Sequence, residues 1–287
     1  MNFEGQNPGG PEPGASSPMP ELKYTLITGG SKGIGKALAR EFAHRGMNLL
    51  LVARNQAGLD AASREITEEF AVPVHTLQAD LSDPDGAFRI FDWCRKEGYR
   101  VNILVNNAGM EGSAEFENAG PEYITDMIQV NVASLVLLTR LFLPEMKTHS
   151  RAYLMNIGSL AGDFPIPFKS VYAASKAFVR CFSRALSLEC KGSGVSITVV
   201  NPNGVPTNDD VRERIGKHSR MVKWLFIRDA EKIARKSVHG MLKGKTLVVP
   251  GFLNRILLLA YWIMPGGITD KLLFRVFQQE VRGKADP

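Results

Sequence analysis

The sequence predicts an α/β fold, a doubly wound parallel sheet of seven strands with helices on both faces. From residue 23 onward, short β-branched or apolar runs alternate with longer segments of helical period, which is the pattern of such a sheet. No linker divides this series. A glycine-rich loop joins the first run to the first helical segment, as in a Rossmann-type fold.

The expected strands are short and rich in β-branched or apolar residues. In order they are Tyr24–Thr28, Asn48–Ala53, Val74–Ala79, Ile103–Asn106, Ala152–Ile157, Ser196–Val200 and Thr246–Val249. Helical periodicity between them predicts helices at about residues 33–45, 57–70, 84–97, 121–148, 169–191 and 230–243. Two segments interrupt this order, the connection Pro206–Ile227 and an apolar tail from Phe252 to Gln279. Long connections at the carboxyl ends of strands commonly act as lids.

We expect one catalytic domain over residues 21–251. A helical extension over residues 252–287 is expected to pack on this domain, at an interface or on a membrane. Residues 1–20 are rich in proline and glycine without the apolar run of a signal peptide, so a disordered leader is predicted. The most apolar stretch, Ile256–Met264, is about half the length that spans a bilayer, and no transmembrane helix is predicted.

Composition is that of an ordinary globular protein, with 44% hydrophobic and 22% charged residues. The net charge is +6, but 29 acidic residues are interspersed among 35 basic ones. This indicates a mixed solvated surface or an anionic ligand, and we expect no nucleic-acid partner. Three cysteines, Cys94, Cys181 and Cys190, form no C-x-x-C pair. They are interpreted as packing or surface thiols in a reducing compartment, and no metal is expected.

The glycine-rich loop predicts a dinucleotide site. Glycines let the backbone turn tightly and approach a pyrophosphate, while the following helix supplies free N–H groups and the positive end of its dipole. A plain turn is the alternative. The loop residues expected to bind the cofactor are Thr28, Gly29, Ser31, Lys32, Gly33, Ile34 and Gly35.

The end of the second strand predicts which dinucleotide is used. An NAD enzyme would hold an acidic residue there to bind the ribose hydroxyls, but this chain has Ala53, Arg54 and Asn55. The missing carboxylate removes repulsion against a 2′-phosphate, and the Arg54 guanidinium suits that phosphate, with Lys32 as a second cation. We predict NADP(H), with NAD and a surface role for Arg54 as the alternative.

These residues carry a resemblance to a known family. The spacing Thr-Gly-x-x-x-Gly-x-Gly at Thr28–Gly35 and the segment Asn106-Asn107-Ala108-Gly109 resemble two motifs of the short-chain dehydrogenase/reductase family. The resemblance covers residues 22 to about 250. It implies that Asn107, Ala108 and Gly109 bind the cofactor and that Asp80, with Leu81 beside it, contacts the adenine amine. For Asp80 a helix cap is the alternative.

A candidate catalytic set lies around the expected helix 169–191. Tyr172 and Lys176 are one turn apart, so they share a helix face, and the ammonium lowers the pKa of the phenol. Ser159 follows the fifth strand and can bind a substrate oxygen. In isolation the pair could be a solvated helix face. The set resembles the family's, which implies that Tyr172 is the general acid/base, that Lys176 binds the nicotinamide ribose, and that Ser159 orients the carbonyl.

Two further segments match the family in part. Asn131 resembles the asparagine that kinks its helix and holds a water leading protons to the lysine; an ordinary packing amide is the alternative. After the sixth strand, Pro202, Val205 and Thr207 match a cofactor-binding Pro-Gly-x-x-x-Thr motif, but Asn203 replaces its glycine. Asparagine tolerates positive φ better than most residues, so we expect the turn to survive.

An apolar substrate is expected, because the segments that hold substrate in the family are apolar here. Residues 229–255 resemble the branch of ketoacyl and ketosteroid reductases. We therefore expect an oxidoreductase of lipid metabolism that moves a hydride between NADP(H) and a carbonyl or alcohol carbon, in the direction of reduction of a 3-oxoacyl or steroid-like ketone. In the segment after the sixth strand, the apolar residues are Met221, Val222, Trp224, Leu225, Phe226 and Ile227.

Several alternatives stay open. The tail covers the pocket, joins subunits or lies on a membrane, where Arg255, Lys271, Arg275 and Arg282 would suit anionic lipid. The resemblance implies a homodimer or homotetramer through the helices at 121–148 and 169–191. We expect a cytoplasmic protein, with peripheral membrane contact through residues 252–280 as an open alternative. The rival functions are a non-catalytic NADP(H)-binding sensor or scaffold protein, and an epimerase or dehydratase, whose glycine spacing and larger substrate domain do not appear.

Overall fold

The computed structural model describes residues 22–203, 229–264 and 266–282, with side chains described as far as residue 278. The expected leader at residues 1–20 lies outside this range. So do the connection Pro206–Ile227, with the apolar residues predicted in it, and the cofactor residues Val205 and Thr207.

Seven parallel strands form one sheet in the order β3-β2-β1-β4-β5-β6-β7. The predicted α/β fold is therefore confirmed. The strand β4 begins three residues earlier than expected, because Arg100 pairs with Lys23 at the start of β1. The edge strand β7 is shorter than expected and pairs with β6 alone. The strands are β1 Lys23–Thr28, β2 Asn48–Ala53, β3 Val74–Gln78, β4 Arg100–Asn106, β5 Ala152–Ile157, β6 Val195–Val200 and β7 Leu247–Val248.

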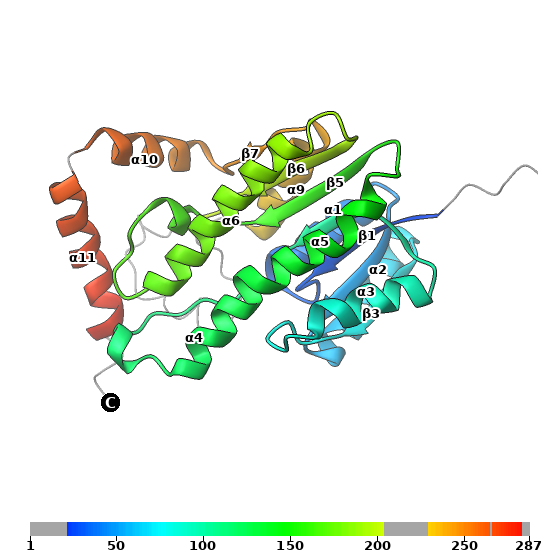
Figure 1. The fold of residues 1–287 in the computed structure, drawn as a ribbon, viewed down its shortest axis with the longest axis horizontal. Helices are drawn as coiled ribbons and strands as arrows, with labels where there is room; N and C mark the ends of the chain where they lie inside the picture. Colours follow the sequence, from blue (N-terminus) through cyan, green and yellow to red (C-terminus); the bar gives the residue numbers. More distant parts are fainter. Residues whose placement is uncertain (1–21, 204–228, 265, 283–287) are drawn as a thin grey trace, which may run out of the picture.

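Helices cover both faces of this sheet (Figure 1). Successive strand residues point to opposite faces, so Ile27 belongs to one buried cluster and Leu26 to the other. The helices are α1 Gly33–Ala43, α2 Gln56–Phe70, α3 Gly86–Lys96, α4 Pro121–Ile128, α5 Ser134–Met146, α6 Ser170–Glu189, α9 Ala230–Leu242, α10 Phe252–Ile263 and α11 Gly266–Arg282.

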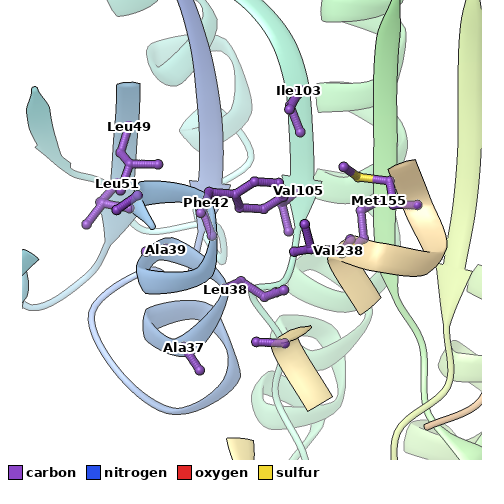
Figure 2. Packing of buried hydrophobic residues seen from close by; sticks show 14 of the residues in the cluster. Ala37, Leu38, Ala39, Phe42, Leu49, Leu51, Ile103, Val105, Met155 and Val238 are labelled. Atoms are coloured by element: carbon purple, nitrogen blue, oxygen red, sulfur yellow. The ribbon is translucent and has the colours of Figure 1, made fainter. Parts of the chain in front are cut away.

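The first face is covered by α1, α2 and α9. Figure 2 shows Leu38 and Phe42 of α1 packed close to Val105 and Met155 of the sheet and to Val238 of α9. All five side chains are fully buried. This packing fixes α1 directly behind β1, so that the loop between them is held from both ends.

The second face is covered by α3, α5 and α6. The helix expected over residues 121–148 is an unbroken helical run over Pro121–Met146, in which a π-helical turn at Gln129–Ala133 lies between α4 and α5. By length and composition, Pro121–Met146 could cross a membrane. In the structure Leu138, Phe142 and Met146 are instead buried against the sheet, as in a core helix. The π turn carries Asn131, which is 1% exposed.

The C-terminal extension is helical, as expected. The helices α10 and α11 lie at one end of the molecule, beyond α6 and the loop that precedes it (Figure 1). Ring contacts connect them to that loop, Phe164 with Tyr261 at 4.6 Å between centroids and Phe168 with Phe274 at 5.8 Å. The extension therefore packs beside the segment that joins β5 to α6.

Candidate active site

The glycine-rich loop lies between β1 and α1, where the strand order reverses between β1 and β4. Gly29 has φ +67°, which L side chains rarely adopt. A β-carbon at Gly35 would collide with the Gly29 carbonyl oxygen and lie 2.5 Å from Asn107 Nδ2. Only glycine fits at this position, and the loop keeps an all-backbone surface at the start of α1, where a phosphate can approach free N–H groups.

The loop is fastened to the end of β4 by Thr28. The backbone N–H groups of Asn107 and Ala108 each donate to Thr28 Oγ1 at 3.0 Å. The Asn107 side-chain amide donates to the carbonyl oxygens of Thr28, at 2.8 Å, and of Gly29, at 3.2 Å. Thr28 and Asn107, which were both predicted to bind the cofactor, therefore hold the shape of the glycine loop.

Two cations belong to this site, one in the loop itself and one after β2. Arg54 follows β2 and Lys32 is the N-cap of α1, and both are exposed. Neither forms an ion pair within the described part of the chain. The carboxylates of Glu65 and Glu69 on α2, by contrast, are paired with Lys36 and Arg40 of α1. Positive charge is thus left available where a 2′-phosphate would lie.

Asp80 lies past the end of β3 and does not cap the next helix. Its Oδ1 accepts hydrogen bonds from the backbone N–H and the hydroxyl of Ser82, at 2.9 and 2.8 Å. The N-cap of α3 is Asp85 instead. Leu81 is 5% exposed and belongs to the core. The structure therefore rules out the helix-cap interpretation of Asp80 and gives Leu81 a packing role.

Lys176 lies on α6 one turn after Tyr172, with its ammonium inside the protein. Its Nζ donates to the Ile157 carbonyl oxygen at 3.1 Å and lies 5.9 Å from the centroid of the Tyr172 ring. Burial lowers the pKa of Lys176 from the ordinary value of 10.5 to about 8, which the negative charge of Glu111 opposes in part. The buried amine close to the phenol therefore loses its proton at a lower pH than an ordinary lysine does.

Asn131 connects the loop after β4 to α6. Its Oδ1 accepts from the Met110 N–H at 2.8 Å, and its Nδ2 donates to the Met110 carbonyl at 2.9 Å and to Ser175 Oγ at 3.1 Å. Ser175 in turn donates to the Tyr172 carbonyl at 2.7 Å. A β-carbon at Gly109 would lie 3.2 Å from Asn131 Oδ1 and 3.3 Å from Lys176 Nζ. The side chain of Asn131 thus fixes the backbone around the tyrosine.

Ser159 caps the short 3₁₀ helix Leu160–Asp163. Its Oγ accepts from the Ala161 N–H at 3.1 Å. A hydroxyl has one proton to donate and two lone pairs, so this bond leaves the proton of Ser159 for another acceptor. A β-carbon at Gly162 would lie 2.5 Å from the Lys176 carbonyl carbon. The loop over residues 159–169, called the serine loop below, therefore lies directly against the backbone of α6.

The sequence did not predict a polar cluster behind Ser159. Asp163, whose side chain is 2% exposed, forms an ion pair with Arg180 of α6 and accepts from Asn201 Nδ2 at 3.2 Å. Together these residues tie the serine loop, α6 and the end of β6. A signal existed in the spacing, because Arg180 follows Lys176 by one helical turn and extends the stripe begun by Tyr172.

The connection after β6 is anchored by its first residues. The Leu160 N–H donates to the Pro202 carbonyl at 3.0 Å, which brings Pro202 to the serine loop. Asn203 is the last residue described before this turn, so the expectation that the turn survives the replacement of glycine stays a prediction. The Asn203 Nδ2 donates to Asn254 Oδ1 on α10 at 3.1 Å. No cluster of three or more metal-binding side chains occurs among the described residues.

Comparison with known proteins identifies the family. Residues 23–217 match the family model of the short chain dehydrogenases. The chain belongs to this family. The short-chain dehydrogenase is 39% identical over 197 residues to a very-long-chain 3-oxoacyl-CoA reductase from Bos taurus, over 64% of this chain and 60% of the relative. The match thus spans less than two thirds of that relative's length.

Two further relatives extend the likeness. The short-chain dehydrogenase is 33% identical over 267 residues to human 17-beta-hydroxysteroid dehydrogenase type 3, over 88% of this chain and 80% of the relative. A short-chain dehydrogenase from Sphingobium yanoikuyae, solved in complex with NADPH, superposes with a TM-score of 0.73 at 32% identity. The superposition covers 80% of this chain and 88% of that structure. The predicted resemblance is therefore confirmed.

Proposed function

We propose that this short-chain dehydrogenase transfers a hydride between NADP(H) and a carbonyl or alcohol carbon, and that it works mainly as a reductase of an apolar ketone. One observation carries the proposal: the Lys176 ammonium is buried 5.9 Å from the ring of Tyr172, on the helix against which the Ser159 loop is packed. Retention of all three groups argues against a non-catalytic sensor or scaffold.

The chain's own residues fit a phosphorylated dinucleotide. The glycine loop excludes side chains at Gly29 and Gly35, and Arg54 and Lys32 supply positive charge beside it. The NADPH complex of the Sphingobium relative supports the same cofactor. NADPH, when bound, supplies the hydride, and all other steps fall to the side chains of the site.

Proton transfer is the task of Tyr172. Its O–H donates to the substrate oxygen as negative charge develops there, while the Ser159 O–H donates to the same oxygen and holds it in place. The ammonium of Lys176 stabilises the phenolate that Tyr172 leaves behind. Asn131 and Ser175 keep the backbone of Tyr172 in position for this transfer.

The surroundings of the site favour an apolar substrate. The segment between Ser159 and Tyr172 presents Phe164 and Phe168 to the C-terminal helices, and Phe168 holds a strained φ of +64°. An open groove between this segment and α11 is lined by Pro165, Pro167, Asp270, Lys271, Phe274 and Arg275. With the names of the relatives, this supports a 3-oxoacyl or steroid-like ketone.

We further propose a cytoplasmic homodimer or homotetramer assembled through α4, α5 and α6. Large apolar side chains on α4 and α6 are exposed, among them Ile128 at 46%, Phe178 at 42% and Leu188 at 76%, and burial between subunits would remove them from water. The thiols of Cys94, Cys181 and Cys190 are free, which suits a reducing compartment.

The test is a screen of NADPH oxidation with 3-oxoacyl thioesters, steroids, quinones and small aldehydes. We expect one class to be turned over clearly, and Tyr172→Phe to abolish that turnover while NADPH binding persists. Tyr24→Phe, on the core face of β1, serves as the matched control. Full turnover by Tyr172→Phe would remove the proposed acid.

Cofactor choice is tested separately with Arg54→Asp. The substitution places a carboxylate beside the expected 2′-phosphate, so the preference for NADPH over NADH should fall. An unchanged ratio of the two kcat/KM values would show that other groups select the cofactor.

A further inference from the structure

The helix α10 turns an apolar stripe away from the body of the protein. Its inner face is marked by Asn254, 1% exposed, and by the half-buried Leu258 and Tyr261, at the spacing of one helix face. The opposite face carries four large apolar side chains in succession. They are Phe252, Ile256, Leu259 and Ile263, which are 74%, 46%, 62% and 74% exposed.

The helix α11 repeats this arrangement and adds charge. Thr269 at the start of the helix is 3% exposed, whereas Ile268, Leu272 and Val276 form a stripe with a spacing of four residues and are 60%, 55% and 45% exposed. Lys271 and Arg275 are exposed immediately beside that stripe. An apolar stripe bordered by basic side chains is the pattern of helices that lie in the headgroup region of anionic membranes.

The dimensions of α10 favour a position in the plane of a bilayer. At about 1.5 Å per residue its 12 residues extend for about 18 Å, short of the roughly 30 Å of a hydrocarbon core. Trp262, 67% exposed at its end, is the type of side chain that gathers at membrane interfaces. Contiguous exposed apolar side chains of this size are uncommon on soluble monomers and usually mark an interaction surface.

We propose that α10 and α11 form a docking surface for an anionic lipid bilayer, with the two apolar stripes in the acyl boundary and Arg255, Lys271 and Arg275 on the lipid phosphates. Charge complementarity selects lipid over a second copy of the chain, because two copies would bring the same three cations together. Asp270 is the one acidic residue between Phe252 and Gln278.

The docking surface lies beside the mouth of the catalytic site. Tyr261 of α10 contacts Phe164, and Phe274 and Phe277 of α11 contact Phe168 and Lys169, the last pair at 5.4 Å from Nζ to the ring centroid. Figure 1 shows both helices at the end of the molecule where this loop lies. Docking would therefore bring the loop between Ser159 and Tyr172 to the bilayer surface.

The test is flotation of the full chain with vesicles of phosphatidylcholine, with and without phosphatidylglycerol. We expect flotation with the anionic vesicles, and much less with phosphatidylcholine alone or at high salt. The double variant Ile256→Ser/Leu259→Ser should lose more than about tenfold in partitioning, because it removes two large apolar groups from the acyl boundary. Lys271→Glu/Arg275→Glu should lose a similar amount.

Two controls distinguish a specific effect of the docking surface from a general effect of net charge and from a loss of folding. Arg64→Glu/Lys191→Glu makes the same change of charge at exposed positions of α2 and the end of α6, and should float like the wild type. Unchanged melting temperatures would show that the variants fold, whatever their activity. Flotation of Ile256→Ser/Leu259→Ser at the wild-type level would overturn the proposal. The proposal would also be overturned if the wild type bound no lipid and the same double variant converted an oligomer to monomers.

Discussion

The side-chain amide of Asn203 donates a hydrogen bond to Asn254 Oδ1 at 3.1 Å, which joins the end of β6 to the first turn of α10. Asn254 also donates to the Pro250 carbonyl at 2.6 Å and is 1% exposed. This buried amide therefore ties the first turn of α10, a helix whose outer face is apolar, to the chain after β6.

We expect Asn254→Ala to lower the free energy of unfolding by about 1–3 kcal/mol, because it leaves the part-buried amide of Asn203 and the buried carbonyl of Pro250 without that partner. Proteolysis near α10 should become faster at the same time. Urea unfolding and limited proteolysis measure both effects. Asn118→Ala is the control, since its amide bonds only Glu115 at the surface; equal effects in the two variants would contradict the prediction.

Thr28→Val should loosen the glycine loop. The valine keeps the shape of the side chain but removes the oxygen that accepts from the N–H groups of Asn107 and Ala108, at a cost of about 1–3 kcal/mol. We expect weaker NADPH binding together with lower stability, measured by fluorescence titration and thermal unfolding. The exposed Thr67→Val on α2 provides the comparison, and wild-type NADPH affinity in Thr28→Val would refute the role of this hydroxyl.

Gly35→Ala should impair cofactor binding more than folding. Its new methyl group would collide with the Gly29 carbonyl and push the loop out of shape, so we expect the Kd for NADPH to rise at least about tenfold. Gly120→Ala is the control, because a β-carbon there meets nothing within 4 Å. Calorimetric titration of both variants with NADPH measures the two Kd values. A wild-type Kd in Gly35→Ala would show that the glycine loop does not need this close backbone approach to bind NADPH.

Lys176 should make stability depend on pH in a defined window. Its pKa is about 8 in the folded chain against an ordinary 10.5, so between these values the unfolded state binds more protons and stability rises with pH. Relative to Lys176→Met, the wild type should gain up to about 3 kcal/mol across this window. Urea unfolding at several pH values measures this gain in stability. If stability changed with pH equally in the two proteins, the lowered pKa of Lys176 would be contradicted.

Asp163→Leu should lower both stability and kcat. It leaves the Arg180 charge without its partner, at a cost of at least about 2 kcal/mol, somewhat less than for a fully buried pair because Arg180 is 24% exposed. Since the pair holds the Ser159 loop, kcat should fall while NADPH affinity stays. Adding Arg180→Met should restore part of the stability, whereas Asp83→Asn, at an exposed pair, should change little.

The sequence predicted those features that depend on neighbouring residues. Each strand is a local run of apolar or β-branched residues, and the loop Thr28–Gly35 is one unbroken motif, so periodicity and spacing were enough to place them. Tyr172 and Lys176 could be paired for the same reason, because a helix brings residues four apart to one face.

Features that depend on distant residues were not predicted. Asp163 and Arg180 are 17 positions apart, and Asn203 and Asn254 are 51 apart, so only the folded chain brings them together. The π turn at Gln129–Ala133 contains Asn131, whose hydrogen-bond partners Met110 and Ser175 lie 21 and 44 positions away in the sequence. The sequence also left the surroundings of α10 open, because a pattern of apolar residues does not show whether the same domain, a second subunit or a membrane covers them.

The backbones of Gly162 and Lys176 are in direct contact, because a β-carbon at Gly162 would lie only 2.5 Å from the Lys176 carbonyl carbon. A variant designed for a changed substrate preference would have to keep glycine at position 162, whereas Pro165, Pro167 and Phe168 farther along the same loop border an open groove or an aromatic ring of α11. Selectivity could then be varied at the outer half of one short loop without displacing the reacting groups held by its inner half.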